Sequence, residues 1–250
     1  MRAWFPLALA AALAVALTFL AVPVVAIFVD RPPADVLASL GEPGALDALW
    51  LSLRTTVTAL AIIVAVGTPA AYLLATRRFR GRALAITLVE LPLVLPPAVA
   101  GIALLAAIGP SLTFHTSAVV VALTFVAAPF YIRQGQAAFG ALDPRWLEAS
   151  RTLGASEART FARVAIPTAV PGLVAGGALA FGRALGEFGA TLMFAGSLQG
   201  VTQTAPLAIY ERFSSDFDDA LALSAVLVAV SAAILLTAKL VGGWDAADRR

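Results

Sequence analysis

The chain has 250 residues, of which 60% are hydrophobic and 13% are charged, and its formal net charge is +2. An ordinary soluble domain carries about 25% charged residues, so a water-soluble core of this size could not hold so much apolar surface. The lack of cysteine excludes disulfides and thiolate sites, and the small net charge gives no footprint for nucleic acid.

Six apolar stretches are long enough to cross a bilayer, because a hydrocarbon layer about 30 Å thick needs about 20 helical residues. The first stretch begins near Arg2 like a signal peptide, but its apolar run continues to Val29, which favours a retained span. The sequence therefore predicts an all-α membrane protein. Its six transmembrane helices are expected at about residues 7–29, 50–75, 83–108, 117–139, 168–196 and 220–241.

The charges in the connecting segments predict the orientation, because short cytoplasmic loops accumulate lysine and arginine. With the N-terminus inside, the only basic residues in the outer segments are Arg31, Arg54 and Arg212. Both termini are therefore expected in the cytoplasm. The inner segments then hold 13 of the 17 basic residues: Arg2, Arg77, Arg78, Arg80, Arg82, Arg133, Arg145, Arg151, Arg159, Arg163, Lys239, Arg249 and Arg250.

Proline and glycine are frequent inside the predicted spans, where they are tolerated if neighbouring helices satisfy the freed backbone groups. Small residues four apart, such as Gly172 and Gly176 or Gly182 and Gly186, let helices approach closely. Helix packing accounts for most of these glycines. A bending or gating role remains open for those of the fifth span.

The longest inner segment, residues 140–167, is too polar to cross the membrane. Asp143 and Pro144 predict the start of a helix, and Gly154 predicts its end. Ser156 can cap a second short helix, which Pro167 is expected to confine before the fifth span. Such a projection suits docking into a groove of another protein, although the physics alone equally allows an interfacial amphipathic hairpin.

The residues of this loop resemble the EAA motif of binding-protein-dependent ABC importer permeases, EAA-x3-G-x9-I-x-LP. Glu148-Ala149-Ser150 is followed at the same spacing by Gly154 and then by Val164, Ile166 and Pro167. Ser150, Val164 and Ile166 depart mildly from the pattern. The resemblance implies a type I ABC importer permease fold over residues 45–241, with residues 1–44 as a first helix and outer loop and residues 242–250 as a tail.

In that family this loop is the coupling region that sits in a cleft of the ATPase subunit. The resemblance implies contact and corner roles for Glu148, Ala149, Ser150, Gly154, Ala155 and Ser156. The expected partners are a second copy of the permease, two ABC ATPase subunits, and a periplasmic or lipid-anchored oxyanion-binding protein. The expected location is the cytoplasmic membrane of a bacterium or archaeon.

ATP is expected to bind elsewhere than on this chain. The only lysine is Lys239, and no Gly-rich loop precedes it, whereas a Walker-type loop needs its lysine within GxxxxGK[ST]. The prediction is a transport subunit without enzymatic activity or cofactor, with ATP and Mg²⁺ held by the partner ATPase.

The fifth predicted span resembles the signature of molybdate permeases, with Arg183 to Gly196 reading RALGEFGATLMFAG. Sulfate permeases are similar but usually read GEYG there. The outer stretch at residues 202–210 and the third-span run at residues 92–97 also look like the molybdate and tungstate group. The resemblance implies import of molybdate or tungstate, with sulfate as the alternative.

Arg183 and Glu187 are expected four residues apart on one helix face near the middle of the fifth span, where mutual pairing lowers the cost of a buried charge. Glu187 would repel a dianion, so a structural or gate-supporting pair is favoured over a substrate contact. Glu90 is expected to pair with Arg54 or with another helix. The gate is expected in the same span, at Gly182, Gly186, Gly189 and Thr191.

Two other classes of function fit the sequence less well. In a membrane-embedded enzyme, Asp216, Asp218 and Asp219 could hold a metal, but solvated surface charge is the better interpretation. His115 is better explained as a turn or interface residue than as a catalyst. An ion-driven secondary transporter often contains inverted repeats. No convincing repeat is found in this sequence.

Overall fold

A computed structural model describes residues 4–29, 36 and 39–241, and these residues form helices and no strand. Five helices are long and apolar enough to cross a membrane, or six if one sharply bent pair counts as a single span. The all-helical prediction is confirmed. The principal α-helices are α1 (Trp4–Val29), α3 (Ala45–Thr76), α4 (Arg82–Val94), α5 (Pro97–Ile108), α6 (Thr116–Gly140), α7 (Pro144–Thr152), α8 (Glu157–Thr160), α9 (Ile166–Leu185), α10 (Gly189–Ala195), α11 (Ala205–Ser215) and α12 (Phe217–Val241).

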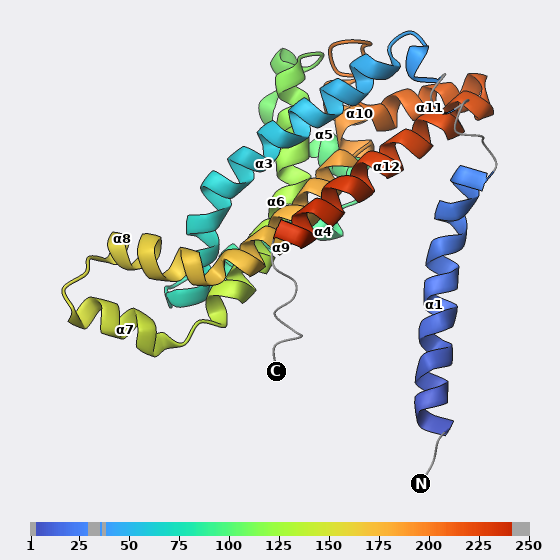
Figure 1. The fold of residues 1–250 in the computed structure, drawn as a ribbon. Coiled ribbons are helices and arrows are strands. Elements are labelled where there is room, and N and C mark those ends of the chain that lie inside the picture. Colours follow the sequence, from blue (N-terminus) through green and yellow to red (C-terminus); the bar gives the residue numbers. More distant parts are fainter. Residues whose placement is uncertain (1–3, 30–35, 37–38, 242–250) are drawn as a thin grey trace.

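Helix α1 stands apart from the other helices (Figure 1). None of its residues is buried, and large apolar side chains such as Phe19, which is 77% exposed, surround it. Its closest packing within the chain is against α12. A helix that is apolar all round needs lipid or another protein surface around it.

The body of the fold is a bundle in which α6 packs between α3 and α9. Small residues allow these close crossings: a Cβ added at Gly67 would lie 2.9 Å from the ring of Tyr131, and one added at Gly172 would lie 2.5 Å from Ala138 Cβ. The prediction that Gly172 serves helix packing is therefore confirmed. Thr68 Oγ1 and Tyr131 Oη, 2.7 Å apart, add a hydrogen bond between α3 and α6.

The third predicted span, at residues 83–108, is not one straight helix. It divides into α4 and α5, whose axes differ by 120°. The break lies at Leu95 and Pro96, which are both extended, because proline disfavours helical geometry in the residue before it and cannot donate a hydrogen bond. Pro97 then begins α5, a position where its missing N–H is not needed.

The fifth predicted span, at residues 168–196, is also interrupted. Helix α9 ends at Leu185 with Gly186 as its C-cap, and the short helix α10 begins only at Gly189. Glycine interrupts helices readily. Gly186 and Gly189, which suggest bending in the sequence, are also the residues at which the span divides.

At its N-terminal end α9 continues directly from the loop that precedes it. Helix α8 leads into a π turn at Phe161–Ala165, in which the Ile166 N–H donates to the Phe161 carbonyl, and α9 follows without interruption. The expectation that Pro167 confines the second loop helix is therefore wrong. Proline is tolerated because it lies in the first turn of α9, where the hydrogen-bond ladder changes from five-residue to four-residue spacing.

The connection between α10 and α12 contains a helix that the hydropathy pattern did not predict. Helix α11 packs against α12 and α3, and the backbone N–H of Ala205 donates to Ser52 Oγ at 2.7 Å. The adjoining acidic residues also have a local structural use, since Asp216 Oδ1 accepts from the N–H of Asp218 at 2.8 Å at the start of α12. Among the described residues, no group of three or more metal-binding side chains comes together.

Candidate functional site

The loop between α6 and α9 forms a projection at one end of the bundle, where α7 and α8 lie side by side (Figure 1). Helix α7 begins as predicted: the carboxylate of Asp143 accepts from the Arg145 N–H at 2.9 Å, and Pro144 is the first helical residue. The side-chain and backbone hydrogen bonds from Arg145 lower the pKa of Asp143. The cap therefore stays ionised at neutral pH.

The corner between the two loop helices requires glycine. Gly154 has a φ of +82°, a conformation that other residues adopt only with strain, and the Ala155 N–H donates to the Ser150 carbonyl at 3.1 Å. Ser156 caps α8 by accepting from the Arg159 N–H at 3.3 Å. The geometry therefore holds the turn in one conformation.

Ser150, which replaces an alanine of the EAA pattern, links the two loop helices. Its Oγ lies 3.0 Å from Oγ1 of the fully buried Thr160. A second link joins the loop to the end of α3, because Glu157 forms ion pairs with Arg151 at 3.0 Å and with Arg77 at 3.1 Å. These contacts make the loop a pre-ordered unit.

The outward face of the loop carries apolar side chains together with motif residues. Leu153 is 88% exposed beside Gly154, and Trp146 is 54% exposed on α7. Glu148 and Ala149 are also exposed, whereas Leu147 turns inward to a small core with Phe139 and Ala165. Leu153 was missed in the sequence because its position in the motif is unspecified, and exposure of a single leucine is not readable from hydropathy.

A second group of predicted residues surrounds the break between α9 and α10. Glu187 lies beyond the end of α9, so the expectation of one continuous helix face is wrong, yet its Oε2 lies 2.5 Å from Arg183 Nη2. Its Oε1 accepts from the Ala190 N–H at 2.7 Å, and only 1% of Glu187 is exposed. The carboxylate therefore both neutralises Arg183 and caps α10.

The four gate candidates have different surroundings. A Cβ at Gly182 would meet nothing within 4 Å, and one at Gly186 would meet only the Gly182 carbonyl at 3.6 Å. Gly189 is tightly packed, since its added Cβ would lie 2.8 Å from Pro97 Cβ. Thr191 is fully buried, and its hydroxyl has no hydrogen-bond partner within the described part of the chain.

The break between α9 and α10 lies beside the break between α4 and α5, because α10 packs mainly against α5. At this contact a Cβ added at Gly101 would lie 2.7 Å from the Ala190 carbonyl oxygen and 2.7 Å from Met193 Cβ. Gly101 was not singled out in the sequence, where it is one small residue in an Ala-rich run. The structure thus brings the two interrupted spans into contact with each other.

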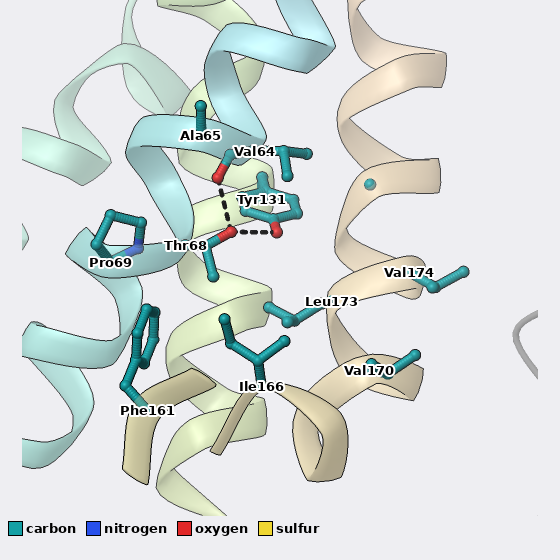
Figure 2. Close-up of a pocket in the computed structure, with 11 residues that line it drawn as sticks. Val64, Ala65, Thr68, Pro69, Tyr131, Phe161, Ile166, Val170, Leu173 and Val174 are labelled. Carbon is teal, nitrogen blue, oxygen red and sulfur yellow. Dashed lines mark hydrogen bonds between the residues drawn. The ribbon is translucent and has the colours of Figure 1, made fainter. Parts of the chain in front are cut away.

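An apolar pocket of about 550 Å³ lies between α3, α6 and α9, beside the base of the projecting loop. Figure 2 shows Thr68 and Tyr131 on one wall, with Phe161 and Ile166 of the π turn and the start of α9 on another. The Thr68 hydroxyl donates to the Val64 carbonyl at 2.6 Å, so the polar atoms of this wall are satisfied. Such a lining offers no charged group to an anion.

Glu90 pairs with Arg133 and not with Arg54. Glu90 Oε1 on α4 lies 2.9 Å from Arg133 Nε on α6. The sequence allowed pairing with another helix but placed Arg133 with the inner loop, whereas it lies within α6, seven residues before Gly140.

Comparison with known families gives a match over residues 67–244 to the model described as "Binding-protein-dependent transport system inner membrane component". The chain is 41% identical to the molybdenum transport system permease protein ModB of Mycobacterium tuberculosis over 233 residues, which cover 88% of each chain. It is 36% identical to a probable molybdenum ABC transporter permease protein of Haloferax volcanii, covering 92% of this chain and 89% of the relative.

Other similarities are more distant. The sulfate transport system permease protein CysT of Escherichia coli is 36% identical over 181 residues, covering 67% of this chain and 65% of that protein. Among solved structures, a chain of a bacterial ABC transporter involved in the import of alginate matches with a TM-score of 0.73 and 17% identity, covering 96% of this chain and 95% of that one. At this identity the structural likeness concerns the fold.

Proposed function

Because the chain belongs to the family of binding-protein-dependent transport system inner membrane components, we propose that it is the membrane-spanning permease subunit of an ATP-driven importer for molybdate or tungstate. The observation that carries this conclusion is 41% identity to a molybdenum permease over 88% of both chains. The chain is a multi-pass membrane protein and a transport subunit, not an enzyme.

Molybdate or tungstate is favoured over sulfate by the extent of similarity. The molybdenum permeases of Mycobacterium tuberculosis and Haloferax volcanii match 88% and 92% of the chain, whereas the sulfate permease matches 67% of it. A molybdate/tungstate permease protein of Pyrococcus abyssi, 31% identical over 80% of this chain, belongs to the same group of relatives. Discrimination between these two nearly isosteric dianions then falls to a soluble binding protein.

The projecting loop is the proposed docking element for an ABC ATPase. In support, Leu153 and Trp146 are exposed apolar side chains on a unit whose order is fixed by Gly154 and the Ser150–Thr160 hydrogen bond. A pre-ordered element loses little conformational entropy on binding. Glu148, Ala149, Ser150, Gly154, Ala155 and Ser156 would form or frame the contact, and ATP and Mg²⁺ would be held by the ATPase.

A second copy of the chain is the proposed membrane partner, and an oxyanion-binding protein the proposed partner on the outer face. The exposed apolar surface of α1, which has no buried residue, supports a further helical surface beside it. A solved alginate ABC transporter is in complex with a periplasmic protein, which supports the general kind of assembly. The basic residues of the inner connections support cytoplasmic placement of both termini in the cytoplasmic membrane.

The gate is proposed at the break between α9 and α10. Gly182 and Gly186 have open surroundings that permit bending, whereas Gly189 fixes α10 against α5. The Arg183–Glu187 pair would support this gate, because the buried carboxylate holds the two sides of the break together. Thr191 contributes a buried hydroxyl beside it.

Reconstitution tests the proposed function directly. The chain is assembled with its cognate ATPase and binding protein in liposomes, and ATP hydrolysis and uptake are measured with molybdate, tungstate and sulfate. Molybdate or tungstate is expected to stimulate hydrolysis and to be taken up. Stimulation by sulfate alone would contradict the substrate assignment, and uptake that persists without the ATPase would contradict the ATP-driven mechanism.

A further inference from the structure

The ion pair between Glu90 and Arg133 joins α4 to α6 but is not buried in the chain. Arg133 Nε lies 2.9 Å from Glu90 Oε1, and the two side chains are 43% and 40% exposed. Arg133 Nη1 also donates to Gln136 Oε1 at 2.8 Å. One end of the guanidinium is thus held by protein while much of the pair faces away from it.

Both charges lie well inside the helices that carry them. Arg133 is seven residues before the inner end of α6 at Gly140, and Glu90 is eight residues after the start of α4 at Arg82. At 1.5 Å per residue, both lie about 10–12 Å along the helices from their inner ends. Counted from those helix ends, this distance falls within an apolar layer about 30 Å thick.

The exposed side of this pair is poorly suited to lipid. Charged residues at such depth almost always face a bundle interior or a water-filled cavity. A long arginine can extend its head toward the interface, but the shorter Glu90 cannot, and its partner holds it at this level. The other sides of α6 are already occupied, by Gly67 of α3 against Tyr131 and by Gly176 of α9 against Gln134.

We propose that Glu90 and Arg133 line the inner, water-filled part of the translocation pathway, and that the Arg133 guanidinium makes a transient contact with the oxyanion on its way to the cytoplasm. This inference rests on the proposed oxyanion function and adds a site to it. Guanidinium groups match pairs of oxygens on tetrahedral anions through parallel N–H donors.

The neighbouring carboxylate of Glu90 makes the contact between Arg133 and the oxyanion weak. Glu90 occupies the guanidinium when no anion is present, so the oxyanion competes with an intramolecular partner and is held only weakly. Weak binding suits a release step, because a permease that held its substrate tightly at the inner mouth would slow its exit. The pathway then contains a cation that does not bind the anion tightly, since the charge of each Arg133 is balanced by one Glu90.

Uptake measurements with three variants separate this role from a purely structural clamp. Arg133→Gln is expected to lower molybdate uptake by about tenfold or more, the effect of losing a charged hydrogen bond to the substrate, while the complex still assembles and hydrolyses ATP. The exchanged pair Glu90→Arg with Arg133→Glu keeps the α4–α6 link but moves the cation, so assembly is expected to be preserved while uptake stays as low as in Arg133→Gln. Arg80→Gln, which removes a cation from the inner connection between α3 and α4, is the matched control and is expected to transport normally.

Wild-type uptake by the exchanged pair, or by Arg133→Gln alone, would overturn the proposal. If wild type itself takes up no molybdate or tungstate, it is the proposed function that fails. That result is distinct from a failure confined to the variants.

Chemical labelling tests the aqueous location without relying on transport. Since the natural sequence has no cysteine, Thr87→Cys places a single thiol one turn from Glu90 on α4, at an exposed position. A membrane-impermeant maleimide applied to inside-out vesicles containing the assembled complex is expected to label it. Leu9→Cys, on the isolated apolar helix α1, is expected to resist labelling, and equal resistance at Thr87→Cys would refute a water-filled face.

Discussion

Glu187 makes two interactions at once: one carboxylate oxygen pairs with Arg183, and the other caps α10. Glu187→Gln keeps a cap for Ala190 but leaves Arg183 unpaired, whereas Glu187→Ala removes both interactions. We expect the first change to destabilise the chain by about 1–3 kcal/mol and the second by more, since unsatisfied buried groups are costly and Arg183 keeps partial access to solvent. Thermal unfolding of the purified protein in detergent measures both.

Glu148→Gln is the matched control for this prediction, because Glu148 is an exposed carboxylate on α7 and its neutralisation is expected to leave the unfolding temperature of the isolated chain unchanged. Equal unfolding temperatures for wild type and both Glu187 variants would show that the pair contributes nothing to stability. The charge pairing itself was readable from the four-residue spacing. The capping of α10 was not readable from the sequence, because it depends on α9 ending at Leu185, two residues before Glu187.

At the scale of elements, the contact between α5 and α10 depends on two glycines on opposite sides. Gly101→Ala and Gly189→Ala would each place a methyl carbon within 2.8 Å of the facing helix. We expect either change to separate the helices and to lower stability by about 1–3 kcal/mol, the range for overpacking. Gly182→Ala meets open space and is expected to be neutral or to stabilise α9 by up to about 1 kcal/mol through helix propensity. Similar unfolding temperatures for all three variants would contradict the close approach.

The sequence predicted elements well where a local property decides them. Hydropathy located α1, α3, α6 and α12, and the dipeptide Asp143-Pro144 located the start of α7, because apolar length and capping chemistry act locally. The 120° bend after α4, the end of α9 at Leu185 and the π turn at Phe161–Ala165 were missed. Proline and glycine indicate that a helix can break, but the packing of neighbouring helices decides where it does.

In the candidate site too, local features were predicted from the sequence and features that depend on the folded chain were not. The motif residues from Glu148 to Gly154 were identified by their spacing, and the corner glycine has the positive φ that the turn requires. The partner of Glu90 could not be identified, because Arg133 is 43 positions away and nothing local links the two. Leu153 and Gly101 were also missed, since exposure and close approach are properties of the folded chain.

At the scale of the whole molecule, the docking loop predicts how the chain meets its ATPase. Leu153→Asp replaces an 88% exposed apolar side chain with a charge and leaves the folded contacts of α7 and α8 intact. If Leu153 enters a groove of the ATPase, copurification of the two proteins is expected to fall by about tenfold or more, because burying an unpaired charge is costly. The unfolding temperature of the permease alone is expected to stay the same.

Phe79→Asp makes the same chemical change at another exposed apolar residue, in the connection between α3 and α4. Copurification with the ATPase is expected to be preserved in this control. Equal losses for both variants would mean that general surface charge, and not a specific contact of the loop, governs the association.

The pocket beside the π turn has a mechanical consequence. Protein interiors normally pack as densely as organic crystals, so one side chain cannot shift without displacing others. Here Phe161 and Ile166 border a pocket of about 550 Å³, while the opposite wall is braced by the Thr68–Tyr131 hydrogen bond. We therefore expect the junction between the loop and α9 to yield before the crossing of α3 with α6 when a load is applied to the loop.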